Sequence, residues 1–365
     1  MIADDIAIDV LTKEDIPKAA ALLVNVFRET DAQKLHLMDE AFYRWQYEET
    51  ESPLVAAKLG GGIVGHYPLT TYRAMSDGMA LKAAVIQDLV TRSDIRGRGV
   101  FRRMGDRAVE LAGELGYDLI YAFPNHRSFP GFVTHHGYTH LSDIRLRVSP
   151  LAPSRVLEER LPLKSLTTFL RPFDRLSLSF FDRTGGYPHH LITEHAELTD
   201  DTATALDRLW VAAGASLGTG LVRDGAYLGW RFFRRPGGDY TLITARDAGG
   251  DDLLAYAVVG RGTFFDLPCG VLMDMLCAPT DAGRKALTAV VSRARRMSAG
   301  EGGVLMLTLT NRHGALLFRC GFFPVPHAAN PRRLRLVVLP LTDRVKETIR
   351  DSRRWYITPA DWDVL

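Results

Sequence analysis

A pattern of residues in the first half of the chain returns in the second half at a nearly constant spacing. The segment from Asp39 to Tyr47 (Asp-x-Ala-x-x-x-Trp-x-Tyr) matches the segment from Asp224 to Phe232 at an offset of 185 residues. Four further landmarks shift by 184 to 190 residues: Asp88 with Asp274, Asn125 with Asn311, Gly137-Tyr138 with Gly321-Phe322, and Ile144–Val148 with Leu334–Val338. Five near-constant offsets are hard to obtain by chance, and the length allows two domains of roughly 150 residues. The repeat therefore predicts two copies of one fold.

Hydrophobic periodicity and turn residues predict the order of elements in the first copy: strand, helix, hairpin, strand, helix, strand, helix, strand. Thr12 and Asp15 fit a capping box before a helix from Ile16, and Gly60–Gly62 fit a hairpin turn. Later strands are expected over 83–91, 117–123 and 141–148, and helices over 100–115 and 126–136. We therefore expect an α/β (α+β) fold, each copy a mixed, mostly antiparallel sheet flanked by helices.

The repeat and the composition divide the chain into four segments. We expect a first domain over 1–148, a partly helical connector over 149–190, a second domain over 191–342 and a docking tail over 343–365. The tail contains two Trp, one Tyr, Asp361 and Asp363, a composition that suggests docking into a groove. It could serve packing alone, or, in an acceptor cleft, Asp361 or Asp363 could bind a substrate amine.

Composition argues against several classes of protein. The chain has 45 Lys and Arg against 43 Asp and Glu, so a globally basic nucleic-acid coat is not expected. Three cysteines (Cys269, Cys277, Cys320) form no pattern with metal-ligand spacing, so we expect buried thiols and no metal site. No signal peptide and no apolar run of about 18 residues is visible, so we expect a cytoplasmic protein without a membrane partner.

The segment Ile86–Phe101 carries the most informative motif. A predicted strand leads into Arg96-Gly97-Arg98-Gly99, which opens directly onto a helix. The free amides at a helix N-terminus form an anion site, and glycines let a backbone approach its ligand closely. Five Arg and one Asp from Arg92 to Arg103 favour a pyrophosphate. The alternative is a tight turn with solvated arginines.

Two motifs in order resemble the GNAT acetyltransferase superfamily. Arg-Gly-Arg-Gly-Val follows Asp88 by eight residues, and Asn125 is followed by a short helix that ends at Gly137-Tyr138. The resemblance covers residues 1–148, and the repeat suggests a tandem GNAT protein, similar in architecture to Fem-type aminoacyl-transferases. It implies acetyl-CoA or another acyl-CoA as co-substrate, held between the strands over 83–91 and 117–123. The implied cofactor-binding residues are Leu89, Val90, Thr91, Arg96, Gly97, Arg98, Gly99, Val100, Phe101 and Asn125.

Two positions depart from the family. Phe101 stands where the superfamily usually has Gly or Ala, and Val133 stands where it often has the Tyr that protonates the CoA thiolate. Ser128 or a water would then replace that acid. The second copy departs further, because Pro279 and Asp281 occupy its loop and no Arg-Gly-x-Gly is present. We expect this copy to have lost the cofactor site.

Asp88 is the candidate general base, directly or through a water. The alternative is a carboxylate that orients its neighbours, since Asp274 recurs in the copy without a phosphate loop. Packing or solvation is a more common role than catalysis for an isolated histidine, and we favour it for His66, His126, His135 and His136. Recurrence of Trp45 and Tyr47 in the second copy favours core packing.

These features lead to one main hypothesis and two alternatives. The main hypothesis is an acyl-CoA-dependent N-acyltransferase, N-acetyl in the first instance, acting on a small-molecule amine bound between the domains. One alternative keeps the fold and uses an aminoacyl-tRNA as donor, with the basic segment Pro331–Arg354 as a tRNA contact. The other is a CoA-binding pseudoenzyme or sensor.

Overall fold

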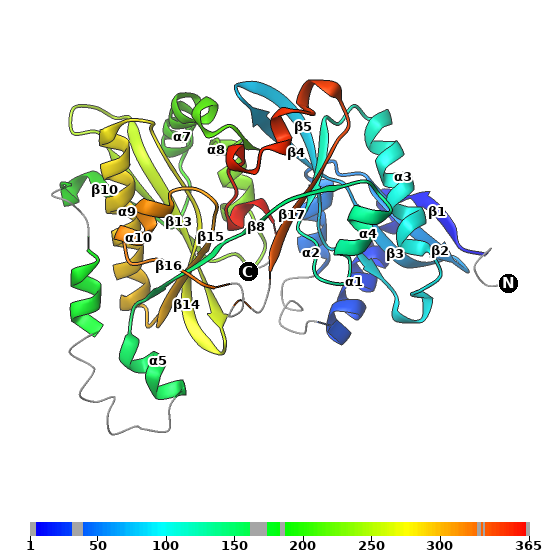
Figure 1. Cartoon of the computed structure of the whole chain (residues 1–365), viewed down its shortest axis with the longest axis horizontal. Helices are drawn as coiled ribbons and strands as arrows, with labels where there is room; N and C mark the ends of the chain where they lie inside the picture. The colour runs from blue at the N-terminus through cyan, green and yellow to red at the C-terminus, as the bar shows by residue number, and fades with distance from the viewer. Residues whose placement is uncertain are drawn as a thin grey trace.

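The computed structural model describes residues 5–30, 39–160, 174–182, 187–326, 330 and 333–362. Within them the strands form three sheets (Figure 1). In spatial order the first sheet contains β1 (Ala7–Val10), β2 (Leu54–Leu59), β3 (Gly62–Pro68) and β6 (Val90–Thr91). The second contains β11 (Thr219–Leu221), β4 (Thr70–Ser76), β5 (Met79–Ile86), β7 (Leu119–Ala122), β17 (Leu334–Pro340) and β8 (Thr139–Ile144). The third contains β10 (Ile192–His195), β12 (Tyr240–Arg246), β13 (Leu253–Phe264), β14 (Leu267–Cys277), β15 (Leu305–Leu309), β9 (Leu146–Pro150) and β16 (Phe323–Pro324).

Most strand pairs are antiparallel, and helices cover the sheets, so the expected fold class is confirmed. Among the described residues only β5–β7 and β14–β15 are parallel. The helices are α1 (Ile16–Thr30), α2 (Glu40–Tyr43), α3 (Val100–Glu114), α4 (Phe129–Thr134), α5 (Pro153–Arg160), α7 (Asp200–Ala213), α8 (Gly225–Leu228), α9 (Asp281–Gly300) and α10 (Gly314–Arg319).

Local sequence explains where the helices begin and end. The capping box of Thr12 and Asp15 is present, on a single 3-10 turn that leads into α1. Helix α3 begins after Gly99 and is followed by Gly116, and both glycines have the positive φ that side chains with a Cβ rarely adopt. Glycines therefore occupy the positive-φ positions at both ends of α3.

Each half of the chain supplies a strand to the sheet of the other half. β17, from the C-terminal half, lies between β7 and β8 and pairs antiparallel with both. β9, from the N-terminal half, likewise pairs antiparallel with both β15 and β16. The expected single strand over 141–148 is therefore wrong, because the chain divides at Arg145 into β8 and β9, which belong to different sheets.

Trp45 and Trp230 join the two halves at matching positions of the repeat. Their rings stack with centroids 4.8 Å apart. The Trp45 indole N–H donates to the Trp230 carbonyl at 2.9 Å, and the Trp230 indole N–H donates to the Trp45 carbonyl at 3.2 Å. Each Trp lies in a π-helical turn that follows a short helix, and Asp39 and Asp224 cap those helices through their side chains. The repeated segment thus has the same local structure twice.

Three apolar clusters fill the space between these layers. One packs α3 against one face of the first half's strands, and another packs α9 against the outer face of the second half's sheet. The largest lies between the halves and contains the Trp pair together with Trp355 and Trp362 of the tail. In Figure 1 the C-terminal segment, in red, accordingly lies between the two halves. All three cysteines are buried and free, as expected.

The strand exchange predicts that neither half folds alone. A fragment of residues 1–190 lacks β17, so β8 loses its partner and one edge of β7 is left unpaired. We expect this fragment to lack cooperative thermal unfolding and dispersed amide resonances. Co-expression with a fragment of residues 191–365 should restore both. A fragment 1–190 that is folded and monomeric by itself would contradict this prediction.

Candidate functional site

The strand that carries the candidate site is interrupted where it leaves its neighbour. β5 runs parallel to β7 as far as the pair Ile86 and Ala122. After Ile86 the chain breaks the ladder at Gln87–Leu89, with Asp88 at a φ of 48°, and β6 then pairs with β3 instead. The predicted continuous strand over 83–91 is thus two strands. Because β5/β6 and β7 part here, a V-shaped opening forms between them.

The loop after β6 presents unpaired amides toward this opening. Gly97 and Gly99 have φ values of 79° and 72°, and a Cβ built on either would meet no atom within 4 Å. None of the amides from Gly97 to Phe101 donates a hydrogen bond to another described residue. The Arg96 amide is already used, because it donates to the Ser93 carbonyl. Open amides at the positive end of α3 suit an anion.

A cavity of about 560 Å³ lies at this point. Nine of the ten predicted cofactor-binding residues line it, as does Ser128, whereas Arg98 is exposed outside the lining and Asp88 is buried away from it. The lining residues are Val26, Phe27, Leu89, Val90, Thr91, Ile95, Arg96, Gly97, Gly99, Val100, Phe101, Arg102, Asn125, Arg127, Ser128, Gly131 and His135. Sequence reasoning did not single out Val26 and Phe27 of α1.

Phe101 is accommodated by a glycine on the facing helix. The centroid of its ring lies 5.7 Å from that of the Phe132 ring and 5.0 Å from that of the His136 ring. A Cβ on Gly131 would lie 2.5 Å from the Phe101 ring, so the large residue on α3 requires the small one on α4. Phe101 therefore turns into the core while it still borders the cavity.

Asn125 organises the opposite wall. Its side-chain oxygen accepts hydrogen bonds from the amides of Arg127 and Ser128, at 2.9 and 3.1 Å, and from the Ser128 hydroxyl at 3.3 Å. This turn fixes the start of α4 and holds Ser128 at the cavity. Val133 is exposed and does not line the cavity.

Asp88 belongs to a buried chain of polar groups. The Tyr47 hydroxyl donates to its carboxylate at 2.8 Å, and its carbonyl lies 3.1 Å from Nδ1 of His66. A carbonyl only accepts, so Nδ1 carries the proton and Nε2 accepts from the Tyr43 hydroxyl at 2.9 Å. Burial lowers the pKa of His66 to about 4, which keeps the ring neutral. Sequence reasoning missed this role of Tyr47, although its recurrence as Phe232 removes the hydroxyl and was a usable signal.

The arginines of the loop differ in how far their side chains are already paired within the protein. Arg92 pairs with Asp94 at 2.7 Å, and the Arg103 side chain donates to the Ile6 carbonyl at 2.7 Å. The Arg96 side chain folds back onto the Thr91 carbonyl at 3.0 Å. Arg98 is exposed and makes no ion pair with another described residue. The positive charge available to a ligand is therefore smaller than the residue count suggests.

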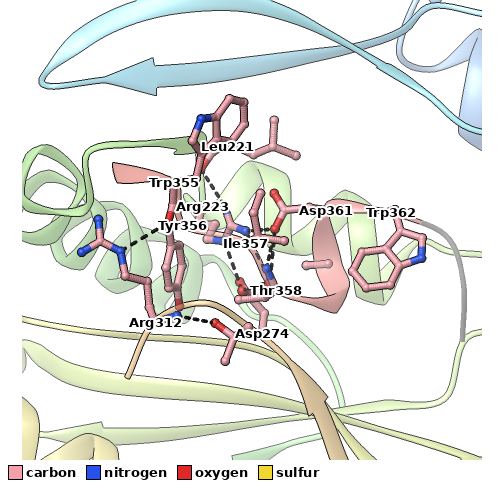
Figure 2. A network of polar contacts seen from close by, with 12 residues as sticks. Leu221, Arg223, Asp274, Arg312, Trp355, Tyr356, Ile357, Thr358, Asp361 and Trp362 are labelled. Atoms are coloured by element: carbon pink, nitrogen blue, oxygen red, sulfur yellow. Dashed lines mark hydrogen bonds and ion pairs between the residues drawn. The ribbon is translucent and has the colours of Figure 1, made fainter. Parts of the chain in front are cut away.

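In the second half, the corresponding opening holds the C-terminal tail (Figure 2). Asn311, the match of Asn125, donates to the Trp355 carbonyl at 2.7 Å and accepts from the Ile357 amide at 3.2 Å. Asp274, the match of Asp88, accepts from the Thr358 hydroxyl at 2.7 Å. The chain's own backbone thus fills the second opening.

A buried ion network holds the tail in this position. Arg223 is fully buried and pairs with both Asp274 and Asp361, and it also donates to the Leu221 carbonyl at 2.8 Å (Figure 2). Burial raises the pKa of Asp361 to about 6, although Arg223 opposes this shift. Removing one partner of such a network would strand a buried charge, which costs about 3–5 kcal/mol. The tail residues from Trp355 to Trp362 are therefore buried in this region, while Asp363 lies outside the described residues.

Comparison with known proteins agrees with this geometry. Residues 7–141 match the family described as acetyltransferase (GNAT) domain. A probable N-acyltransferase from Enterococcus faecalis V583 superposes with a TM-score of 0.60 at 11% identity, over 92% of this chain and 72% of that chain. A GCN5-related N-acetyltransferase from Anabaena variabilis gives 0.59 at 11% identity, over 92% and 73%. Saccharomyces cerevisiae N-myristoyltransferase with bound myristoyl-CoA gives 0.59 at 11% identity, over 93% and 86%.

Residues 7–141 therefore match a GNAT domain, and nearly the whole length of the chain shares the fold of solved GCN5-related N-acetyltransferases. No curated protein matches the sequence. In the described part of the chain, no helix has the length and apolar character of a membrane span. The same residues include no group of three His, Cys, Asp or Glu side chains able to hold a metal ion.

The loop assignment predicts the effect of Gly99→Ala. A Cβ here would point into the space proposed for the pyrophosphate, and the positive φ adds roughly 1–2 kcal/mol of backbone strain. We expect at least a tenfold loss of CoA affinity in calorimetric titration. Gly116→Ala is the matched control, because Gly116 has a φ of 70°, open space around its Cβ and lies at the far end of α3. Equal CoA affinity in both variants would refute the loop.

The occupied second opening predicts one CoA per chain. The second loop lacks free glycine amides, and Trp355 to Thr358 fill the space beside Asp274 and Asn311. Titration should give a stoichiometry near one, and a crystal soaked in CoA should show density at Gly97–Phe101. Density against Pro279–Arg284 would contradict this assignment.

Proposed function

We propose that the chain is an acyl-CoA-dependent N-acyltransferase, with acetyl-CoA as the first candidate donor and a small-molecule amine as acceptor. The observation that carries the proposal is the row of unpaired amides from Gly97 to Phe101, which opens onto the cavity where β5 and β7 part. We also propose that the two halves are GNAT-like repeats, divided near residues 148, 190 and 342, of which only the first binds the donor. The matched Trp pair and the filled second opening support this division.

Chain residues would hold the donor along the cavity. The amides of Gly97–Phe101 would bind the pyrophosphate, and the edge from Leu89 to Thr91 would bind the pantetheine arm opposite Asn125. The Leu89 amide lies in the break between β5 and β6 and donates to no described residue. It is therefore the best-placed N–H to stabilise the oxyanion that forms on the thioester carbonyl.

The transfer would form one C–N bond and break one C–S bond. The acceptor nitrogen attacks the thioester carbonyl, the CoA thiolate leaves, and the nitrogen loses a proton. Asp88 does not reach the lining, so it would take that proton through a water. Ser128 borders the cavity and would pass a proton to the thiolate while it takes one from a water, so that CoA leaves as the thiol.

The role of Ser128 can be tested by Ser128→Ala. The backbone amides still hold Asn125, so the turn should persist while the hydroxyl is lost. We expect kcat to fall about tenfold with an unchanged CoA dissociation constant, less than the roughly 10²–10⁴-fold of a fully positioned general acid because a water can replace the hydroxyl. Ser93→Ala is the control, since Ser93 is exposed on the preceding turn and does not line the cavity. A loss of less than twofold would remove Ser128 from the mechanism.

An aminoacyl-tRNA donor remains the second candidate because of one observation. β17 brings the basic C-terminal segment into the first half's sheet, and the Arg335 guanidinium lies 4.9 Å from the centre of the Phe129 ring at the start of α4. The segment is thus beside the candidate site and not remote from it. Arg332 lies outside the described residues.

Neutralising two sets of arginines decides between the donors. For acyl-CoA, replacing Arg96 and Arg98 with Gln should weaken donor binding, each contact being worth about 1.5–3 kcal/mol. The triple replacement of Arg332, Arg333 and Arg335 should leave acetyl-CoA affinity within twofold. A tRNA donor would instead show a steep loss of affinity with salt, and the triple variant would lose binding on a retention gel.

A further inference from the structure

Five side chains between the two halves end in buried polar atoms that have no hydrogen-bond partner within the described part of the chain. They are Gln46 Oε1, Gln87 Oε1 and Nε2, the Tyr121 hydroxyl, Asp361 Oδ1 and Trp362 Nε1. Leaving a buried donor or acceptor unpaired costs about 1–3 kcal/mol. Folded proteins rarely leave several together, so this group indicates that a ligand or waters complete it.

Strand register brings two of these residues to the point where the strands part. Tyr121 lies directly opposite Val85 in the parallel β5–β7 pair. Phe123 follows Tyr121 by two residues and packs, like Tyr121, against the cluster between the halves. Gln87 lies in the break directly after β5, at the point where the strands part.

The tail supplies the opposite wall. The rings of Phe123 and Trp362 lie 5.0 Å apart, and those of Tyr121 and Trp355 lie 5.2 Å apart. Burial and the nearby Asp361 carboxylate raise the pKa of Tyr121 well above its usual value, which is consistent with the two groups being close.

Gln46 extends the group at the first half's end. Its amide nitrogen donates to the Tyr72 hydroxyl at 3.4 Å, and the Tyr72 ring lies 6.4 Å from Tyr227. The Tyr227 hydroxyl in turn donates to the Ala360 carbonyl at 2.9 Å, directly before Asp361. Contacts therefore link Gln46, Tyr121 and the tail residues Asp361 and Trp362 through the central core, and Gln87 lies in the chain at the end of β5.

The group adjoins the donor cavity along both strands. Leu89 follows Gln87 by two residues, and Asn125 follows Phe123 by two residues, and both Leu89 and Asn125 line that cavity. Both pairs lie just beyond the ends of β5 and β7, so the five-residue group and the donor cavity are neighbours along the chain. An acceptor bound among the five side chains would thus reach a thioester held beside Leu89.

We propose that these five side chains form the acceptor site, and that the acceptor is a hydroxyl-bearing primary amine of the amino-sugar or amino-polyol class. This inference rests on the proposed function. Three of the atoms only accept hydrogen bonds (Gln46 Oε1, Gln87 Oε1, Asp361 Oδ1), and three others donate (Gln87 Nε2, the Tyr121 hydroxyl, Trp362 Nε1). An amine with several hydroxyls offers both kinds of partner, whereas a hydrocarbon amine would leave the donors unpaired.

The aromatic rings fit the same class of ligand. Phe123, Trp355 and Trp362 surround the polar atoms with apolar faces. The C–H faces of a sugar or polyol pack against such rings while its hydroxyls reach the polar atoms. The site therefore selects compact molecules that are polar at their edges and apolar on their faces.

The test uses the full chain and two matched amines. D-glucosamine and cyclohexylamine share a six-membered ring and a primary amine, but only the first has hydroxyls. Release of CoA thiol from acetyl-CoA should depend on D-glucosamine and not on cyclohexylamine. Tyr121→Phe and Trp362→Phe each remove one unpaired polar atom and keep an aromatic ring, so both should fold. Each should raise the KM for D-glucosamine about 2–10-fold, the value of one hydrogen bond, with CoA affinity unchanged.

Tyr138→Phe is the control, because Tyr138 is a buried tyrosine in the core on the α3 side of the first half. It should leave the KM unchanged. Equal turnover with cyclohexylamine, or an unchanged KM for D-glucosamine in both Tyr121→Phe and Trp362→Phe, would overturn the inference. If no amine is acetylated, calorimetry of D-glucosamine binding separates the two proposals. Binding that is weakened by Tyr121→Phe keeps the site and rejects the transfer, and no binding by the wild-type chain rejects the site.

Discussion

The exchange of β9 and β17 governs the rest of the molecule. Each of these strands fills a gap between two strands of the other half, so the hydrogen bonds of both sheets are complete only when both halves are folded. The exchange also draws the chain after β17 back across the central core, where the tail ends in the second opening. The filled opening follows from this crossing, whereas the donor cavity comes from the break between β5 and β6.

Much of this fold could be predicted from the sequence, because local signals were strong. The capping box at Thr12, the hairpin glycines and the glycine at the end of α4 each fix a local conformation that the structure contains. The exchange could not be predicted, because apolar and polar residues are mixed on both sides of Arg145 in the run over 141–148, and nothing in it assigns one part to another sheet. Pairing partners depend on the whole chain, whereas periodicity reports only on neighbours.

The candidate site shows the same division between local and distant information. The glycine loop could be recognised because a helix N-terminus is a local feature, and most of its residues line the cavity. The sequence predicts Asp88 beside the acyl group, whereas the break at Gln87–Leu89 directs its carboxylate to Tyr47. No sequence pattern indicates the positive φ of Asp88 that causes this break. The contact between Phe101 and Gly131 was likewise not visible in the sequence, because 29 residues lie between them.

The reciprocal hydrogen bonds of Trp45 and Trp230 have a consequence for motion. The two hydrogen bonds and the stacked rings of this pair join matching positions of the two halves. Together with the two exchanged strands, they prevent the halves from moving as separate rigid bodies. Many two-domain enzymes admit substrates by hinge opening, in which one domain swings away from the other. Here such a movement would have to break the hydrogen bonds that pair β17 with β7 and β8, and β9 with β15 and β16. Under the proposed function, substrates would therefore enter and leave through small displacements of loops and side chains around the donor cavity, within a scaffold of nearly constant shape.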